Sequence, residues 1–436
     1  MNIRFTVVAA ASALAALPSW GQGIPVTGST NITISGLLSV GMKESAISQG
    51  NATAGRNTAN EFHVDDNTSR LIIASTSEIT KGWNVIFRLE SRFTPNVRPG
   101  DPLLPAVGGA PANLAVNDAT GFADGDTWGG VSSPYGTVIV GKSTLYYTDT
   151  ISAGYLASAL EQPGESYRIW DANGLGTFNL LSTYNTFGVS ATGAITPSTK
   201  NILGNTRSRN VVRYDSITFK PDTESLLNFS LAYSKNPAGA QNMWTAAANT
   251  TQYESGSTIY AKGLYNGHGF SFMASYLDQK FQGVLDSAPN AELKATRLGL
   301  SYKWQGLKVG IVTDSTDMVN GISTALAAGG SSLTDSKRTS IEVPISYSFG
   351  DHAVYFTYGK AGSTSSISDS GAKQLNLVYD YALTKRAFLG VYYTKLDNDA
   401  NAYYQPFLSG YSPFGGSAIA KGESWHQVGI ILNYWF

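Results

Sequence analysis

The chain has 436 residues, and its 30 Lys and Arg against 31 Asp and Glu leave a net charge of −1. That balance gives no basic surface of the kind that binds nucleic acid. The absence of cysteine excludes disulfides and thiolate metal sites. The histidines, His63, His268, His352 and His426, lack metal-ligand spacing, so the sequence predicts no metal and no cofactor.

The first residues have the layout of a secretory signal peptide. Arg4 supplies a positive charge, and the apolar run from Val7 to Leu17 is broken only by Ser12. Small residues then precede Gln22, and the run is too short for a spanning helix. The sequence predicts a signal peptide at residues 1–21 and a mature domain at residues 22–436.

Short turn signals and long polar stretches alternate along the mature chain. The seven turn signals are Thr80–Gly82, Ser133–Gly136, Lys220–Thr223, Asn266–Gly269, Trp304–Gly306, Phe349–His352 and Leu383–Arg386. The eight long stretches lie roughly at 44–67, 95–125, 143–207, 235–256, 280–295, 315–338, 361–372 and 397–423. Fifteen connections require sixteen strands, and the alternation of lengths is typical of hairpins that cross a bilayer with short periplasmic turns and long external loops.

The segments between these connections have a two-residue hydrophobic period, so one face of each strand is apolar. Clear examples are Leu227–Tyr233, Phe270–Tyr276, Ile341–Phe349 and Leu375–Tyr381. Several apolar faces end in an aromatic residue near a turn, as expected at a lipid interface. Pro344 lacks a ladder donor, which predicts a bulge or local break in its strand. Lipid cannot satisfy backbone polar groups, so the strands must close into a barrel, and sixteen strands leave a water-filled lumen.

The last strand supports this interpretation. Counting back in twos from Phe436 gives Tyr434, Leu432, Ile430 and Val428, all apolar, whereas the intervening positions are mixed. A chain that ends on such a strand with an aromatic carboxy-terminus resembles the outer-membrane β-barrels of Gram-negative bacteria. The resemblance implies that the barrel-insertion machinery recognises the strand ending at Phe436.

Several segments resemble the general porins of β-proteobacteria. They are Ser69–Leu71 with Trp83–Ser91, Trp128–Thr137 with Gly141–Lys142, Arg209–Ser216, and Tyr379–Arg386. The resemblance implies an all-β fold, a 16-stranded antiparallel transmembrane β-barrel whose third external loop constricts the pore, and a homotrimer. Ala74 stands where the family usually has a second basic residue, and the chain ends Asn433–Phe436 rather than in a His-Arg-Phe type, so ion selectivity stays open.

Alternation with the lipid face directs a set of charged residues to the lumen. The basic members are Arg70, Arg88, Arg92, Arg209, Arg213, Lys262 and Arg297, and the acidic members are Glu90, Asp215, Glu342 and Asp380. The third loop adds Asp149, Glu161, Glu165 and Asp171. By resemblance, Arg70, Lys142 and Arg213 form a basic wall that faces the loop carboxylates, although Lys142 shares its parity with Val138 and Val140. The predicted constriction comprises Arg70, Arg88, Arg92, Lys142, Arg209, Arg213, Glu161 and Glu165, and its transverse field would align small polar solutes.

Two residue patterns that could suggest an enzyme lack the neighbouring features that the chemistry requires. Residues 136–143 match the phosphate-loop pattern, but the intervening residues are strand formers and no helix follows. Ser424 and His426 lie two residues apart without a nucleophile elbow or an orienting partner. The sequence therefore predicts that the protein is not an enzyme.

The predicted function is an outer-membrane porin for passive diffusion of small hydrophilic solutes and ions. A solute-specific channel is the first alternative, because aromatic residues in the third loop could stack on a sugar or an aromatic acid: Tyr146, Tyr147, Tyr155, Tyr167 and Trp170. An adhesin or phage-receptor barrel acting through its external loops is the second. The expected partners are outer-membrane lipid and lipopolysaccharide, two further copies of the chain, the insertion machinery and the solutes. Ion preference, solute size limit and gating stay open.

Overall fold

The structure, a computed structural model, describes residues 30–49, 60–66, 69–92, 123, 125–146, 149, 187–189, 195–197, 208–235, 256–281, 291–323, 333–365, 367–402, 404 and 422–436. The strands are β1 (Thr30–Gln49), β2 (Asn60–Asp66), β3 (Arg70–Thr80), β4 (Trp83–Arg92), β5 (Thr127–Ser133), β6 (Gly136–Ser143), β7 (Phe187–Val189), β8 (Ile195–Pro197), β9 (Ser208–Ser216), β10 (Leu226–Lys235), β11 (Gly256–Gly267), β12 (Phe270–Phe281), β13 (Ala291–Trp304), β14 (Leu307–Ser323), β15 (Leu333–Phe349), β16 (His352–Ala361), β17 (Ala372–Ala382), β18 (Ala387–Asn398) and β19 (Ser424–Trp435). In this part of the chain, no helix has the length and apolar character needed to cross a membrane.

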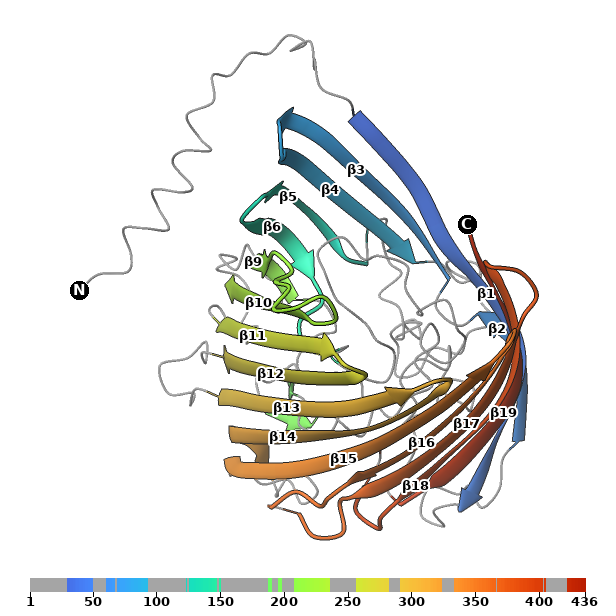
Figure 1. Cartoon of the computed structure of the whole chain (residues 1–436). Helices are drawn as coiled ribbons and strands as arrows, with labels where there is room; N and C mark the ends of the chain where they lie inside the picture. Colours follow the sequence, from blue (N-terminus) through green and yellow to red (C-terminus); the bar gives the residue numbers. More distant parts are fainter. Residues whose placement is uncertain are drawn as a thin grey trace, which may run out of the picture.

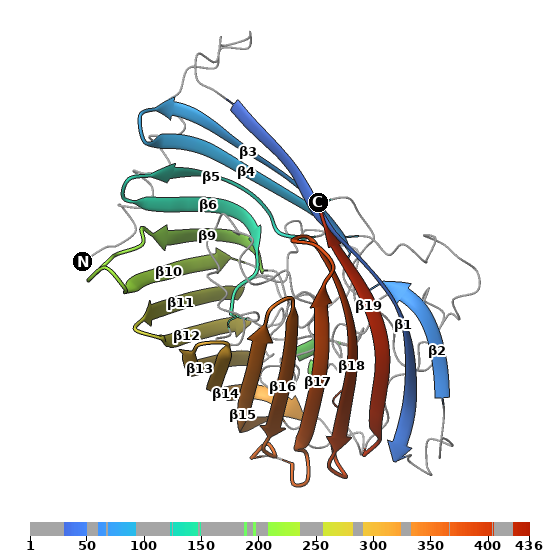
Figure 2. The ribbon, with the colours of Figure 1, turned by 45° about the vertical axis from the view of Figure 1, so that its right-hand side comes forward.

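The main sheet closes on itself. Each strand from β3 to β19, the separate β7–β8 pair excepted, is antiparallel to the next along the sheet, and β1 pairs with β19 from Leu37↔Trp435 to Gln49↔Ser424 (Figures 1 and 2). On its other edge β1 pairs with both β2 and β3, which are therefore two halves of one interrupted strand. With these two counted once, the described residues form a closed antiparallel barrel of sixteen strands, as the sequence predicts.

A side chain repairs the ladder where β2 and β3 are interrupted. The pairing of β1 passes from Val40↔Asp66 to Leu37↔Arg70, so one extra residue lies on the β2–β3 side. The buried Ser69 hydroxyl accepts a hydrogen bond from the backbone N–H of Ser39 at 3.0 Å and donates one to its carbonyl at 3.2 Å. It thus satisfies backbone groups that the break would otherwise leave unpaired.

All seven predicted turns lie between consecutive strands at one end of the barrel. Some use the left-handed backbone conformation of a tight hairpin, as at His268 (φ 53°) and Gly269 (φ 81°). Several loops were predicted too long. The range 315–338 contains the end of β14 to Ser323 and the start of β15 from Leu333. These strand ends have polar residues on both faces, so the hydrophobic period disappears before the strand does.

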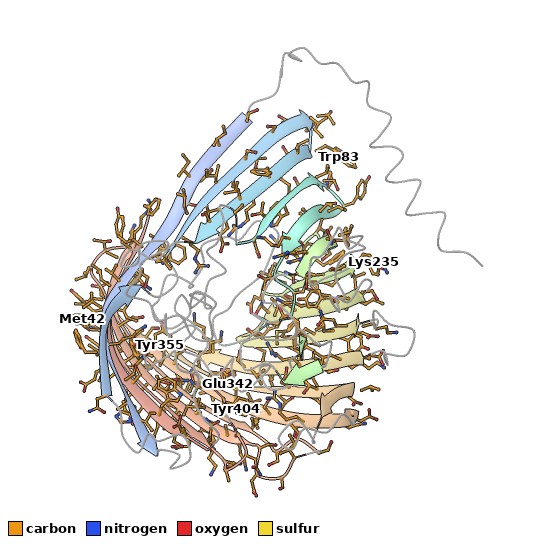
Figure 3. The ribbon with its side chains drawn as sticks, turned by 180° about the vertical axis from the view of Figure 1, so that it is seen from behind. Met42, Trp83, Lys235, Glu342, Tyr355 and Tyr404 are labelled. Atoms are coloured by element: carbon orange, nitrogen blue, oxygen red, sulfur yellow. The ribbon has the colours of Figure 1, made fainter. Side chains whose placement is uncertain are left out.

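The predicted lipid faces are confirmed. On β10, for instance, Leu231 and Tyr233 are exposed whereas Ser230 and Ser234 are buried, and side chains project outward all around the wall (Figure 3). Aromatic rings cluster near the turns, with Phe270 4.6 Å from Tyr302 between ring centroids. Their positions match the aromatic residues that flank the apolar band of membrane barrels.

Pro344 produces a break without a bulge. The pairing of β14 with β15 is interrupted between Val309↔Ile345 and Val312↔Glu342, and the register is the same on both sides. On the other edge, Pro344 stays paired with Thr357 of β16. The missing N–H therefore removes ladder bonds toward β14 only.

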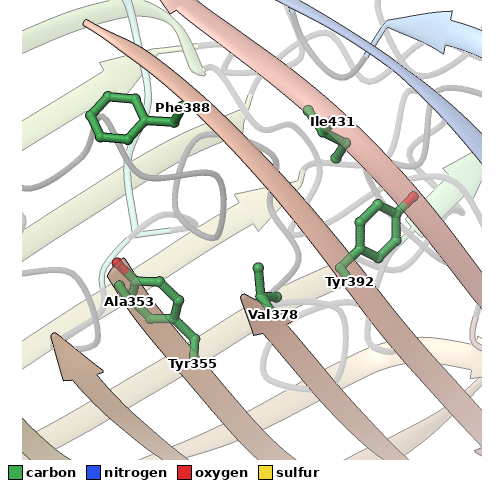
Figure 4. Close-up of a cluster of buried hydrophobic side chains, with 6 residues drawn as sticks. All are labelled: Ala353, Tyr355, Val378, Phe388, Tyr392 and Ile431. Atoms are coloured by element: carbon green, nitrogen blue, oxygen red, sulfur yellow. The ribbon is translucent and has the colours of Figure 1, made fainter. Parts of the chain in front are cut away.

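The inner faces of β16 to β19 contribute an apolar cluster to the wall. Its buried members are Ala353, Tyr355, Val378, Phe388, Tyr392 and Ile431 (Figure 4). Because inner-face residues alternate with lipid-facing ones along each strand, this cluster packs inside the barrel rather than against lipid.

Candidate functional site

A set of buried basic side chains, here called the basic ladder, lies on the inner face of the barrel between β4 and β15. Its members are Arg88 on β4, Arg213 on β9, Lys262 on β11, Arg297 on β13 and Arg338 on β15. Each stands at the parity opposite to the exposed apolar residues of its strand, such as Val212 beside Arg213. The inward direction predicted for Arg88, Arg213, Lys262 and Arg297 is what the structure shows. Lys43 on β1 is also buried.

Strand register places two ladder residues, Lys262 and Arg297, in one row with two carboxylates. Direct cross-strand pairs run Asp215↔Ser230↔Lys262↔Ser275↔Arg297↔Asp314↔Ser340 across β9 to β15. The serines leave room for the long basic side chains on the neighbouring strands. This alternation of large and small residues brings several charges to one level of the barrel.

Each ladder residue has a carboxylate close by. Arg88 Nη2 is 3.0 Å from Glu90 Oε2, and Arg213 Nη2 is 2.8 Å from Asp215 Oδ1. Ser230 donates a further hydrogen bond to the same oxygen of Asp215 at 2.5 Å. These side chains are less than a tenth exposed, so the pairing offsets the cost of removing each charge from water.

Asp314 is the centre of a second group. Its Oδ2 lies 3.1 Å from Arg297 Nε, and its Oδ1 lies 3.6 Å from Arg338 Nη2. Arg338 also donates to the Tyr404 hydroxyl at 2.7 Å. One fully buried carboxylate therefore lies close to two fully buried guanidinium groups.

The start of the third loop is fixed to this row. The Tyr146 hydroxyl donates to Asp314 Oδ2 at 2.6 Å, and the Arg297 guanidinium lies 4.6 Å from the centre of the Tyr146 ring. Asp149 accepts hydrogen bonds from Lys262 Nζ and from the Tyr260 hydroxyl, both at 2.8 Å. Since Tyr146 and Asp149 follow β6 whereas their partners belong to β11, β13 and β14, these two loop residues lie against the inner wall of the barrel.

Arg70 differs from the ladder. Leu37, its register partner, is buried on the inner face, so Arg70 points the same way. It is half-buried, and its guanidinium lies 5.6 Å from the centre of the Trp435 ring. Within the described residues it has no hydrogen-bonded or ion-paired partner. Arg92 is its cross-strand neighbour, although the Arg92 side chain lies outside the described part of the chain.

The structure does not bring Lys142 and Arg209 to the ladder. Lys142 has the parity of the exposed Val138 and Val140, and its Nζ donates to the Ala123 carbonyl at 2.6 Å. Pairing of β6 with β9 passes from Gly141↔Val211 to Ser143↔Ser208, so β9 has one extra residue there. This bulge reverses the parity beyond it, and Arg209 is exposed. The uninterrupted alternation from which the sequence directs Arg209 to the lumen therefore does not hold across this bulge.

The remaining predicted residues divide into two groups. Glu90, Asp215, Glu342 and Asp380 are buried on inner-face positions as predicted, and Asp149 is buried in the loop. Glu161, Glu165 and Asp171 lie outside the described residues. Sequence reasoning missed Arg338 because it fell inside the predicted loop 315–338. The two-residue spacing of Arg338, Ser340 and Glu342 would have indicated that the strand continues.

Within the described part of the chain, no cluster of His, Asp and Glu side chains is suited to hold a metal ion. What the inner wall presents is a row of ion pairs and hydroxyl groups. Such a wall can hydrogen-bond water and small polar solutes.

A closed sixteen-stranded barrel with an apolar outer face and a charged inner wall defines a transmembrane channel of the outer-membrane type. The family model "Gram-negative porin" matches residues 5–401 of the chain. The chain thus belongs to the Gram-negative porin family, and it is an outer-membrane channel for passive diffusion of solutes.

Solved porin structures have the same fold. The anion-selective porin from Comamonas acidovorans superposes with a TM-score of 0.64 at 19% identity, covering 94% of this chain and all (100%) of that one. OmpT of Vibrio cholerae superposes with a TM-score of 0.55 at 10% identity, covering 95% of this chain and 100% of that one. OmpF of Salmonella typhi, solved with daunomycin, superposes with a TM-score of 0.52 at 13% identity, covering 93% of this chain and 97% of that one. A comparison with curated proteins found no match.

Proposed function

We propose that this porin is a general diffusion channel for small hydrophilic solutes and ions, and that its third loop narrows the lumen opposite Arg70. The observation that carries the proposal is the attachment of Tyr146 and Asp149 to the ladder strands. A loop fixed at this level occupies part of the cross-section, so solutes pass between the loop and the remaining wall. Glu161 and Glu165, which belong to the same loop, are the proposed carboxylates of the narrow region.

We further propose a weak preference for anions. The ladder cations each have a carboxylate close by, whereas the Arg70 guanidinium has no carboxylate partner among the described residues. Arg88 and Arg213 contribute to the proposed basic wall, with Arg92 beside Arg70. Lys142 and Arg209 remain candidates for the outer entrance of the pore rather than its narrowest part. The structural relative from Comamonas is itself described as anion-selective.

Single-channel conductance of the folded protein in a planar bilayer tests both proposals. We expect ohmic conductance without saturation by any one solute, and a reversal potential of anionic sign in a salt gradient. Arg70→Gln should move the reversal potential toward the cation side. Lys235→Gln is the matched control, because Lys235 on β10 is exposed and follows the inward-facing, buried Ser234 (Figure 3). Equal shifts in both variants would contradict the role of Arg70.

A solute-specific channel is less well supported, because Tyr146 is buried and its hydroxyl and ring are already used by Asp314 and Arg297. Concentration-dependent block of conductance by one sugar or aromatic acid would nevertheless favour it. Absence of conductance from folded protein would favour the adhesin or phage-receptor alternative.

We also propose the assembly of the channel: a homotrimer of barrels exported by a signal peptide at residues 1–21, in contact with lipopolysaccharide. The terminal residue supports recognition by the insertion machinery, since Phe436 exchanges backbone hydrogen bonds with Gly36 at 3.1 and 3.2 Å and so closes the barrel. Three equal conductance steps per insertion event would support the trimer, and steps of a single size that occur one at a time would contradict it.

A further inference from the structure

The outer face of the barrel has a belt of charged side chains at the strand ends far from the short turns, here called the rim belt. Its members are Asp278, Lys280, Glu292, Lys294, Asp317, Lys337, Lys360, Lys373, Lys395 and Asp397. They have the parity of the lipid-facing residues: Lys360 and Lys373, for example, are exposed beside the buried Ala361 and Ala372. The belt therefore lies at the outer margin of the apolar band, where lipid head groups begin.

Most lysines of the rim belt are neutralised by a carboxylate of the belt itself. Lys294 Nζ is 3.0 Å from Glu292 Oε2, and Lys280 Nζ is 3.4 Å from the other oxygen, Glu292 Oε1. Lys337 Nζ is 3.0 Å from Asp317, the residue directly opposite it on β14. These opposite-charge neighbours are the favourable arrangement for facing positions in a sheet.

Lys360 and Lys373 have the opposite arrangement. They are direct cross-strand partners on β16 and β17, and both are exposed. Asp397 lies opposite Lys373 on the next strand, but its Oδ2 is 2.9 Å from Lys395. Within the described residues neither Lys360 nor Lys373 has an ion-paired carboxylate. Like charges that face each other in a sheet are destabilising unless an anion lies between them.

The surface next to the two lysines toward the turns is apolar. On the outward face of β16, Tyr358 is the next residue from Lys360 toward the turn. On the outward face of β17, Leu375 and the exposed Leu377 are the next residues from Lys373 in the same direction. The two strands lie side by side along the wall (Figure 2), so these residues form one continuous strip on the turn side of the lysine pair. Two ammonium groups above an apolar strip match an anionic head group above acyl chains.

We propose that Lys360 and Lys373 bind a phosphate monoester on the head group of an outer-leaflet lipid. Facing side chains in a sheet have Cβ atoms about 5 Å apart, so both ammonium groups can reach different oxygens of one phosphate. A phosphate monoester carries a charge of about −1.5 to −2, which matches two lysines better than a single-charge diester. The site identifies residues that would make the lipopolysaccharide contact proposed above. The inference rests on that proposed contact only for the identity of the lipid.

Native mass spectrometry of the full-length folded protein, released from vesicles of phosphatidylcholine containing phosphatidic acid, tests the proposal. The variant is Lys360→Gln with Lys373→Gln. With a contribution of about 1 kcal/mol per lysine, the retained phosphatidic acid should bind about thirty-fold more weakly to the variant than to the unaltered protein. Lys294→Gln with Lys337→Gln is the matched control, because it removes two rim-belt lysines that belong to ion pairs, and it should retain the lipid.

Equal lipid retention by the unaltered protein and both variants would overturn the proposal. So would full displacement of the lipid by millimolar inorganic phosphate, because the site would then recognise free phosphate rather than a lipid. Replacement of phosphatidic acid by phosphatidylglycerol, a diester, should reduce retention. Single-channel conductance should be the same in all three proteins, so failure of the lipid site is distinguishable from failure of the channel.

Discussion

The inner wall of the barrel has two unlike halves. The charged half, β4 to β15, holds the basic ladder and its carboxylates, and it fixes the start of the third loop. The amide half, β16 to β19, holds Gln374, Asn376 and Gln427 beside the apolar cluster, with Asp380 as a buried carboxylate. Each neutral hydrogen bond contributes about 1 kcal/mol, whereas an unpaired buried charge costs several times more. Loss of a partner should therefore be felt far more in the charged half.

Asp314→Asn is the substitution with the largest expected effect. It leaves Arg297 and Arg338 without their common carboxylate at a fully buried position, at a cost of about 3–5 kcal/mol. We expect a markedly lower unfolding midpoint, followed as the loss of the folded barrel's electrophoretic mobility on heating. The reversal potential should also move toward the anion side. Asp317→Asn removes a partly exposed carboxylate of the same strand and should leave the midpoint unchanged.

Asp149→Asn tests whether the charged half holds the third loop. The change weakens hydrogen bonds from Lys262 and Tyr260, and bonds to charged groups contribute about 1.5–3 kcal/mol. We expect a moderate loss of stability together with larger open-channel current noise, because the loop is less firmly attached. Quiet conductance identical to that of the unaltered protein would show that Asp149 does not hold the loop.

Sequence reasoning worked where a strand has a lipid face. The period of Leu227, Phe229 and Leu231 fixes the parity of β10, and the same logic correctly directs Lys262 and Arg297 inward. It failed where local geometry overrides parity. Asn210, with φ 53°, lies in the bulge that turns Arg209 away, and nothing in the residue pattern marks that site.

Contacts between distant segments were equally beyond sequence reasoning. Tyr146 and Asp314 are 168 residues apart, and their hydrogen bond depends on how the third loop turns after β6. Strand alternation gives the direction of a side chain but not which loop residue meets it. The sequence therefore predicts Tyr146 as a stacking platform for solutes in the solute-specific alternative, whereas in the structure its ring packs against the Arg297 guanidinium.

Tyr392→Phe is the matching test in the amide half. It removes a hydrogen bond of 2.7 Å to Gln427, which itself donates to Ser45 at 2.7 Å. The expected loss of stability is about 1 kcal/mol, because both hydrogen-bonding groups are neutral and the Phe side chain has nearly the same shape as Tyr. Conductance and reversal potential should stay unchanged. A loss as large as that of Asp314→Asn would remove the distinction between the two halves.

The smallest expected effect lies below the charged half, in the periplasmic turns. His268 is 3.3 Å from Asp222 and 3.0 Å from Glu224, and the hydrogen bond with Asp222 raises the His268 pKa above its ordinary value. Because the pKa of His268 is higher in the folded state, its contribution to stability is fully present below about pH 6.5, where the unfolded histidine is also protonated. That contribution is lost as the pH rises through the raised pKa of the folded state. Because the group is exposed, only a slight pH dependence of the unfolding midpoint is expected. NMR titration of His268 should give a pKa above the ordinary value, and Asp222→Asn should return it toward that value; an unchanged titration would show that the carboxylate does not act on the imidazole.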